Sequence, residues 1–409
     1  MIKRLLRPCA VLAALATAIL ACAPAGQTPT PPAKPPATSV LGPAGSPVLP
    51  AGASPPATAS PLPAAASPSP AAAASPAAAS SPAASPGPGA PSYPTIQIAS
   101  KPATVRIGYQ VIPNSELLAK QLRMHEQAFG VPIEWRQFDS GRDVNTAMAS
   151  GSIDIGLVGS AGTAAGIAQN LPYEVIAIYD VEGDNESLVA KAGINSIADL
   201  KGKKVAAPFG STTHYSLLKV LQLNNINQNE LTIIDMQPPD MLAAWTRGDI
   251  DAGYVWQPTL QKMLDSGGKR LISSAEVAAR GFPTSDVAVA HRDFTSKYPD
   301  LVAVYVQDLS KATDLFRSDP DRASQDMAKE LNLTAPSALQ QMKELIWLNS
   351  FEQLEPSYFG STQSPGDFGN ALKQTADFLV DQKTIRSAPD LATYQQAANP
   401  AYLQRSVGR

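Results

Sequence analysis

Beyond residue 100 the chain alternates short apolar runs with longer stretches in which apolar residues recur three and four positions apart. The short runs predict strands and the longer stretches predict helices. The predicted strands span residues 104–110, 132–138, 153–158, 174–179, 187–191, 204–209, 231–236, 253–256 and 286–290, and the predicted helices span 115–129, 144–149, 212–223, 294–316, 322–331, 337–348 and 371–382. Repeated strand-then-helix units predict an α/β fold with parallel or mixed sheets covered by helices.

The first twenty-two residues follow another pattern. A short basic segment, Met1–Arg7, precedes an apolar stretch over 9–20 that is too short to cross a membrane comfortably. The stretch ends in Ile19-Leu20-Ala21-Cys22, which resembles the site at which bacterial lipoproteins are cleaved and acylated. We expect 1–21 to be a lipoprotein signal peptide and Cys22 to carry the lipid anchor. An ordinary signal peptide with a chance cysteine is the alternative.

We expect residues 22–100 to form a lipidated cysteine followed by a disordered tether. Between Ala23 and Pro94 the chain holds 21 of its 38 prolines, among alanine, serine and threonine, and Lys34 is the only charged residue between 23 and 100. Such a composition does not bury enough apolar surface to offset the entropy of ordering it. We expect a stalk that holds a folded domain away from a membrane.

Composition excludes several classes of function. Residues 101–409 contain 28 basic and 35 acidic residues, a net formal charge of −7, which argues against nucleic acid as a partner. The only cysteines are Cys9 and Cys22, so the folded part has no disulfide, thiolate nucleophile or cysteine-bound metal. Sequence motifs of hydrolases, metalloproteases, P-loop enzymes and dinucleotide-binding enzymes are missing as well.

Histidine is scarce, which further disfavours catalysis and metal binding. Of the three histidines, His125 falls in an amphipathic helix and is expected at the surface, and His291 ends a strand and is expected to be structural. We therefore predict a protein that is not an enzyme and needs no metal or cofactor.

The segment that joins the strand at 204–209 to the helix at 212–223 is the strongest candidate site. It contains Ser211, Thr212 and Thr213, followed by His214. A helix N-terminus presents unpaired N–H groups and a partial positive charge, and so binds anions without lysine or arginine. A simple N-cap is the alternative reading, but a cap needs only one such hydroxyl.

Two other strand ends carry neutral hydrogen-bonding groups. Gln110 ends the first predicted strand, and Ser160 follows the small residues that close the strand at 153–158. Ligands of open α/β sheets bind at the carboxyl ends of strands. These residues therefore predict a site for a small polar ligand.

Three longer segments resemble the substrate-binding proteins of nitrate/sulfonate/taurine-type ABC importers. They are WRQFDSG from Trp135, PFGSTTHYSLL from Pro208, and QPPDMLAAWTRGDIDAGYVW from Gln237. The resemblance implies a two-lobed periplasmic-binding-protein-like fold of type II with a ligand cleft between the lobes. We expect one lobe from 101–187 plus 286–409, another from 188–285, and crossings near 187–191 and 283–287.

The resemblance also implies a role for each candidate residue. A sulfonate would bind at Ser211 to His214, with Gln110 and Ser160 beside it, and Asp286 and Glu186 would bind an ammonium group. Trp256 would wall the cleft. Ordinary core packing for Trp256 and a surface position for Glu186 remain the alternatives.

These expectations combine into one function. The chain is expected to be an exported, lipid-anchored, monomeric solute-binding protein that captures taurine or a related small organosulfonate. It would deliver this ligand, by closure of its lobes, to an ABC permease and its ATPase. Binding of another small anion, such as an alkanesulfonate or nitrate, and a ligand-sensing adaptor for a membrane receptor are the alternatives.

Overall fold

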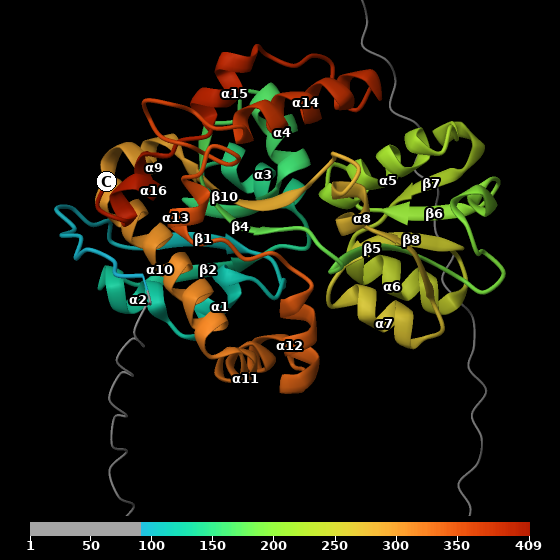
Figure 1. Ribbon diagram of the computed structural model, residues 1–409, viewed down its shortest axis with the longest axis horizontal. Coiled ribbons are helices and arrows are strands. Elements are labelled where there is room, and N and C mark those ends of the chain that lie inside the picture. Colours follow the sequence, from blue (N-terminus) through green and yellow to red (C-terminus); the bar gives the residue numbers. More distant parts are fainter. Residues whose placement is uncertain (1–90) are drawn as a thin grey trace, which may run out of the picture. The chain divides into compact units, whose positions relative to one another are not determined.

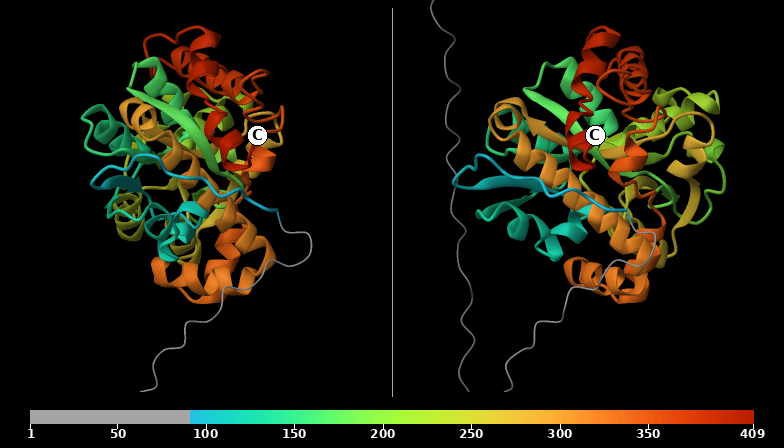
Figure 2. Two further views of the ribbon diagram at one scale, coloured as in Figure 1. Left: turned by 90° about the vertical axis from the view of Figure 1, so that its left-hand side faces the viewer. Right: turned by 60° about the vertical axis from the view of Figure 1, so that its left-hand side comes forward.

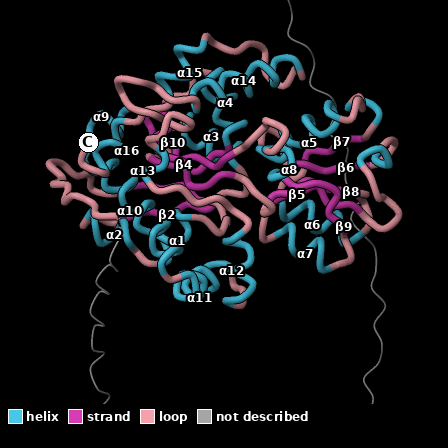
Figure 3. Tube along the Cα trace, in the orientation of Figure 1, coloured by secondary structure: helices cyan, strands magenta, loops and turns pink. Residues whose placement is uncertain are grey.

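The computed structural model describes residues 91–409, all of which belong to one compact unit that holds two separate five-stranded sheets. The sheets lie side by side with helices on both faces of each (Figures 1 and 3). The predicted signal peptide, Cys22 and nearly all of the predicted tether lie outside the described residues. The expected α/β class with two sheets is confirmed.

The first sheet has the strand order β2-β1-β3-β10-β4. Its strands are β1 (Val105–Tyr109), β2 (Ile133–Gln137), β3 (Ile155–Gly159), β4 (Tyr173–Val181) and β10 (Ser285–His291). Strand β1 pairs in parallel with β2 and β3, whereas β10 runs antiparallel to β3 and β4. The carboxyl ends of β1 and β3 therefore meet the start of β10 at one edge.

The second sheet has the order β7-β6-β8-β5-β9. Its strands are β5 (Glu186–Ala190), β6 (Lys204–Ala207), β7 (Thr232–Asp235), β8 (Ala252–Trp256) and β9 (Lys269–Ser273). Strand β6 is parallel to β7 and β8, and β5 is antiparallel to β8 and β9. Both sheets thus repeat one plan, in which the fourth strand in spatial order, β10 or β5, runs antiparallel to its two neighbours.

Helices cover both sheets, and the C-terminal ones return to the first sheet (Figure 2). The helices are α1 (Ser115–Gln121), α2 (Met124–Phe129), α3 (Gly141–Ala149), α4 (Ser160–Ala168), α5 (Thr212–Leu223), α6 (Pro238–Arg247), α7 (Thr259–Asp265), α8 (Ser274–Ala278), α9 (Arg292–Lys297), α10 (Pro299–Ser318), α11 (Pro320–Leu331), α12 (Ala335–Lys343), α13 (Ser350–Gln353), α14 (Phe368–Asp381), α15 (Leu391–Ala397) and α16 (Ala401–Ser406). We call the first sheet with α1–α4 and α9–α16 the first lobe, and the second sheet with α5–α8 the second lobe.

The chain passes between the lobes at residues 182–185 and 279–284. All of β5 pairs within the second sheet, so the first passage precedes the expected crossing at 187–191, and Glu186 and Ser187 belong to the second lobe. A tight turn explains the difference, because the Asn185 side chain accepts a hydrogen bond from the Gly183 N–H at 2.8 Å. The turn follows β4 and leads the chain into β5 of the second sheet at Glu186.

Each lobe has its own apolar core. The core of the first lobe gathers residues from β1, β3, β4 and β10 with α10, whereas two smaller cores lie on the two faces of the second sheet. Trp256 is one exception, since it ends β8 in the second sheet yet packs with the core of the first lobe. Tyr215 of α5 is another, since it packs edge-on against Phe378 of α14, with 5.2 Å between ring centroids.

Local chemistry explains where the predicted elements break. The expected helix at 115–129 divides because Arg123 takes a left-handed conformation, with φ of 54°. The expected helix at 294–316 divides at Pro299, which begins α10. Strand β9 was not predicted, because its sequence Lys269-Arg270-Leu271-Ile272-Ser273 begins with two charged residues.

The prediction for His125 was wrong. Its side chain is fully buried, its Nδ1 lies 3.2 Å from Asp308 Oδ2, and its ring stacks on Tyr305 at 4.5 Å between centroids. Helical periodicity identified the apolar face but did not reveal that a buried carboxylate would accompany the imidazole. Among residues 91–409, no helix combines the length and apolarity needed to cross a membrane.

Candidate functional site

A narrow cavity lies between the lobes at the carboxyl ends of β1 and β3. Its volume is about 20 Å³, close to the space of one water molecule. The residues that line it are Gln110, Ile112, Gly141, Gly159, Glu182, Asn185, Gly210, Ser211, Thr212, Trp256 and Asp286. Five of the predicted site residues, namely Gln110, Ser211, Thr212, Trp256 and Asp286, are in this set.

One wall of the cavity is the N-terminus of α5. Gly210 has φ of 83°, a conformation that favours glycine, and it brings the chain into the helix over a tight turn. Ser211 is the N-cap, because its Oγ accepts from the His214 N–H at 3.2 Å. The Thr213 hydroxyl lies 2.7 Å from the same oxygen. Ser211 and Thr213 thus build the cap, and Thr212 faces the cavity.

His214 supplies no positive charge to this helix end. Its ring stacks on Phe209 with 4.4 Å between centroids, and its Nδ1 lies 3.4 Å from the Gly210 N–H. Burial lowers the pKa of His214 to about 4, so the imidazole is neutral at physiological pH. The positive potential at this wall therefore comes from backbone N–H groups alone.

Buried carboxylates lie beside the same cavity, which Glu182 and Asp286 border. Oxygens of Asp180, Glu182 and Asp286 lie within 4.8 Å of one another, and all three side chains are buried. Asp180 and Asp286 face each other in register across β4 and β10. We call these three residues the acid cluster.

Burial and mutual repulsion both act on the acid cluster. Burial raises the pKa of Asp286 well above its ordinary value, and the nearby Asp180 and Glu186 carboxylates raise it further. Burial likewise raises the pKa of Asp180 and of Glu182. Within residues 91–409, no ion pair joins these acids or Glu186 to a basic residue. The cluster therefore favours a cation or protons.

Amide side chains donate hydrogen bonds to two carboxylate oxygens of the acid cluster. Asn114 donates to Asp180 Oδ2 at 2.9 Å, and Asn185 donates to Glu182 Oε2 at 2.6 Å. The other oxygen of Asp180 is buried without a hydrogen-bond partner. The sequence analysis missed Asp180 and Glu182, although their spacing of two at the end of a predicted strand places both on one face.

Glu186 lies behind the cavity wall. Thr212 donates to its Oε2 at 2.5 Å, Ser274 donates to its Oε1 at 2.7 Å, and Ser216 lies at 3.5 Å. Burial raises the pKa of Glu186 to about 7, against the lowering effect of these hydroxyls. Glu186 is thus buried, and the alternative of a surface position for it is wrong. It ties the starts of α5 and α8 to β5.

Ser160 and Gln110 hold the framework of the cleft. The Ser160 hydroxyl accepts from the Ser285 N–H at 3.3 Å, and its side chain borders a different cavity, of about 460 Å³, beside α14. It is therefore directed away from the cleft cavity. Gln110 borders the cleft cavity while its Nε2 donates to the Leu157 carbonyl at 3.1 Å.

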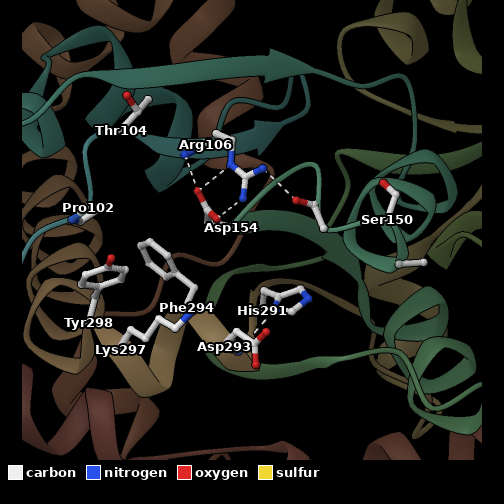
Figure 4. Close-up of a pocket in the computed structure, with 12 residues that line it drawn as sticks. Pro102, Thr104, Arg106, Ser150, Asp154, His291, Asp293, Phe294, Lys297 and Tyr298 are labelled. Atoms are coloured by element: carbon white, nitrogen blue, oxygen red, sulfur yellow. Dashed lines mark hydrogen bonds and ion pairs between the residues drawn. The ribbon is translucent and has the colours of Figure 1, made fainter.

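A third cavity, of about 540 Å³, lies at the opposite end of the strands of the first sheet, where β1 and β3 begin and β10 ends (Figure 4). Arg106 crosses it, donating to Asp154 through Nε at 3.1 Å and to the Gly151 carbonyl through Nη1 at 2.8 Å. His291 lies on the far side, where its Nδ1 accepts from the Asp293 N–H at 3.3 Å. Arg106 and Asp154 are thus paired with each other, and this cavity lies away from the cleft between the lobes.

Two lobes around a buried polar cleft define a class of solute-binding protein, and comparison with known proteins agrees. The chain belongs to the family described as the substrate-binding domain of the ABC-type glycine betaine transport system, which matches residues 103–330. Members of this family are solute-binding proteins rather than enzymes.

Three similar proteins are named for the binding of taurine or of sulfonates. The chain is 32% identical over 313 residues to the taurine-binding periplasmic protein of Escherichia coli K12, covering 76% of this chain and 95% of that protein. It is 28% identical over 240 residues to a putative aliphatic sulfonates-binding protein of the same organism, covering 58% and 74%. The fold matches the alkanesulfonate-binding protein SsuA from Xanthomonas axonopodis pv. citri bound to MOPS, with TM-score 0.61, 24% identity and coverage of 73% and 99%.

Proposed function

We propose that this protein captures taurine, or a related small organosulfonate that carries an amine, outside the cytoplasm and delivers it to an ABC importer. The observation that carries this proposal is a charge asymmetry across one narrow cavity. In the part of the chain that the structure describes, a helix N-terminus without a basic side chain borders the same cavity as two acids of a buried cluster that has no cationic partner. A short zwitterion with an anion at one end and an ammonium at the other complements both walls.

The helix end is suited to the sulfonate. The first N–H groups of α5 have no partner within the helix, and Thr212 borders the same cavity while its hydroxyl donates to Glu186. A sulfonate keeps its charge at physiological pH and offers three acceptor oxygens. In this proposal Thr212 and the backbone at Gly210 and Ser211 contact the sulfonate, whereas Thr213, His214 and Ser160 position the contacting groups.

The acid cluster is suited to a primary ammonium rather than a quaternary one. An ammonium donates hydrogen bonds to carboxylate oxygens, and Asp286 and Glu182 both border the cavity. Quaternary ammonium ligands such as glycine betaine are recognised mainly by aromatic faces. Trp256 is the one aromatic residue that borders the cleft cavity, which supports an amine over a betaine.

Delivery follows from a hinge movement. The cavity is too small for an organosulfonate as it stands, so ligand entry requires the lobes to part about the two crossings at 182–185 and 279–284. The proposed cycle is opening, ligand binding and closure, followed by docking of the monomer on a permease paired with an ATPase. The periplasmic location of the relatives supports export of this chain.

The proposal is tested by calorimetric titration of the full-length chain, in detergent, with taurine, propanesulfonate, nitrate, sulfate and glycine betaine. We expect taurine to bind most tightly, with propanesulfonate weaker because it lacks the ammonium. Tightest binding of glycine betaine would contradict the proposed role of the acid cluster. Tightest binding of nitrate or sulfate would exclude an amine-bearing ligand.

The membrane anchor forms a separate prediction. Cys22 lies outside the described residues, and the proposal that it carries lipid rests on Ile19-Leu20-Ala21-Cys22. Replacing Cys22 by Ala should shift the expressed protein from the membrane fraction to the soluble fraction. Replacing Cys9 by Ala, within the removed signal, should leave fractionation unchanged. A Cys22→Ala protein that still sediments with membranes would contradict the anchor.

A further inference from the structure

Three polar side chains cross between the lobes at the rim of the cleft. Arg142 in α3 donates from Nη1 to Asp235 Oδ2 at 2.6 Å, and Asp235 ends β7 in the second lobe. Gln237, the N-cap residue of α6, donates from Nε2 to Ser140 Oγ at 3.0 Å and is 3.4 Å from Asp143 Oδ2. We call Arg142, Asp235 and Gln237 the rim latch.

We propose that the rim latch sets the balance between open and closed lobes, and thereby ligand affinity, without touching the ligand. The inference rests on the proposed function for its ligand, whereas the lobe balance is a property of the protein alone. None of the three side chains borders the cleft cavity. Gly141, which precedes Arg142, and Gly210, which follows the Phe209 N–H bound by Asp235, do border it. The rim latch therefore acts through lobe position.

The position of the rim latch in the two sheets supports this role. Strand β7 is the edge strand of the second sheet, three places from β5, which follows the first crossing. Arg142 follows β2, the edge strand of the first sheet farthest from β4. A hinge opening moves the points farthest from the hinge the most, so these contacts break early.

Contacts beside the hinge differ from the rim latch in this respect. Gln257 donates to Glu344 Oε2 across the lobes at 2.8 Å, but its own N–H donates to the carbonyl of Asn185 in the first crossing. A bond so near the crossing changes little when the lobes rotate. Of these polar contacts, the rim latch therefore responds more strongly to lobe opening, and it acts beside the apolar contact of α5 with α14.

Asp235 also links closure to the proposed sulfonate site. Its Oδ1 accepts from the Phe209 N–H at 2.9 Å, in the turn that leads into α5, while its Oδ2 accepts from Arg142. Asp235 thus holds the turn and the opposite lobe at once. We expect the turn to be best ordered when the lobes are closed.

The expected effects are moderate, because Arg142 and Asp235 keep side-chain exposures of 43% and 36%. An exposed ion pair changes an equilibrium by up to about fivefold, and a neutral hydrogen bond by a similar factor. Apparent affinity falls in proportion to the loss of the closed population. We expect Arg142→Ala and Gln237→Ala each to raise Kd about 2- to 5-fold, and the pair together about tenfold.

The test measures affinity and lobe position in the same variants. Lobe position is read by single-molecule energy transfer between labels at Gln127→Cys and Leu223→Cys, both exposed and on different lobes, in a full-length chain with Cys9 and Cys22 replaced by Ser. Arg142→Ala should lower the closed fraction without ligand and weaken taurine and propanesulfonate equally. Arg142→Lys should restore part of both. Arg247→Ala, which breaks an exposed ion pair inside the second lobe, is the matched control and should change neither.

The outcomes separate this inference from the proposed function. An unchanged closed fraction in Arg142→Ala would overturn the rim latch, whatever happens to affinity. A lowered closed fraction with unchanged affinity would also overturn it, since closure would then not determine binding. If the unmodified chain binds neither sulfonate, the proposed function fails, while the closed fraction without ligand still decides whether the latch holds the lobes together.

Discussion

Replacing Asp286 by Asn should weaken taurine binding about 10- to 100-fold and leave propanesulfonate unchanged or slightly tighter. Asp286 is 4% exposed, borders the cavity, and faces Asp180 in register. A hydrogen bond to a charged group contributes about 1.5–3 kcal/mol, which corresponds to this range in affinity. Propanesulfonate gains nothing from the carboxylate, because its binding leaves a buried acid without a cation.

Calorimetry on both ligands with both proteins measures this effect. Asp184→Asn is the matched control, because Asp184 lies in the first crossing near the cluster but is exposed. We expect Asp184→Asn to change neither affinity by more than about twofold, as for surface substitutions in general. Equal losses of taurine and propanesulfonate in Asp286→Asn would mean that Asp286 supports the fold and does not recognise the amine.

Taurine affinity should rise with pH through the neutral range, whereas propanesulfonate affinity should stay nearly flat. Burial raises the pKa of Glu186 to about 7, and it raises those of Asp180, Glu182 and Asp286 well above their ordinary values. These carboxyls hold protons at low pH, and an ammonium favours their ionised form. Taurine binding therefore releases protons, and affinity gains up to about tenfold per pH unit for each proton released.

Stability without ligand should follow the opposite trend. A carboxyl whose pKa is raised by folding binds more protons in the folded chain than in the unfolded chain. Its contribution to the free energy of unfolding is full below its ordinary pKa and is lost as pH rises through the folded value. For Glu186 this window runs from 4.5 to about 7. His214 opposes this trend, because folding lowers its pKa from 6.5 to about 4 and its contribution to stability therefore rises with pH over that range. The net fall in stability thus depends on the acid cluster and is clearest above pH 6.5.

Two measurements check the pH behaviour. Titration calorimetry in buffers of different ionisation heat counts the protons released, and thermal unfolding across pH gives the stability trend. Glu186→Gln should reduce the slope of taurine affinity against pH, while Glu276→Gln, whose carboxylate caps α8 outside the acid cluster, should preserve it. Identical slopes for taurine and propanesulfonate would rule out titration of the acid cluster on binding.

The sequence was sufficient for the class of fold and for one wall of the site. Strand-then-helix alternation predicted the α/β class, and the run of hydroxyls at Ser211–Thr213 identified the start of α5. The sequence did not show which hydroxyl faces the ligand. Ser211 caps the helix and borders the cavity together with Thr212, whereas Thr213 is directed away from it, because the helix turns successive side chains by about 100°.

The other wall was harder to predict for a topological reason. Asp286 came from the resemblance, whereas Asp180 and Glu182 were missed because they lie at the end of β4 and just beyond it, after a mostly apolar run. Their meeting with Asp286 depends on β10 returning antiparallel beside β4 from more than a hundred residues away. The sequence also placed Ser160 in the cleft. Its hydroxyl instead accepts a hydrogen bond from the Ser285 N–H, and local sequence does not show that this distant backbone group lies beside it.

The packing of Trp256 gives the protein an internal fluorophore for following its own occupancy. The other three tryptophans each keep their indole N–H bonded within one lobe, to Glu126, Ser266 and the Met342 carbonyl. Trp256 instead spans the cleft, carried by the second sheet and packed with the core of the first lobe. Movement of the lobes should change the polarity around this indole most directly, so its emission is expected to report ligand capture without any attached label.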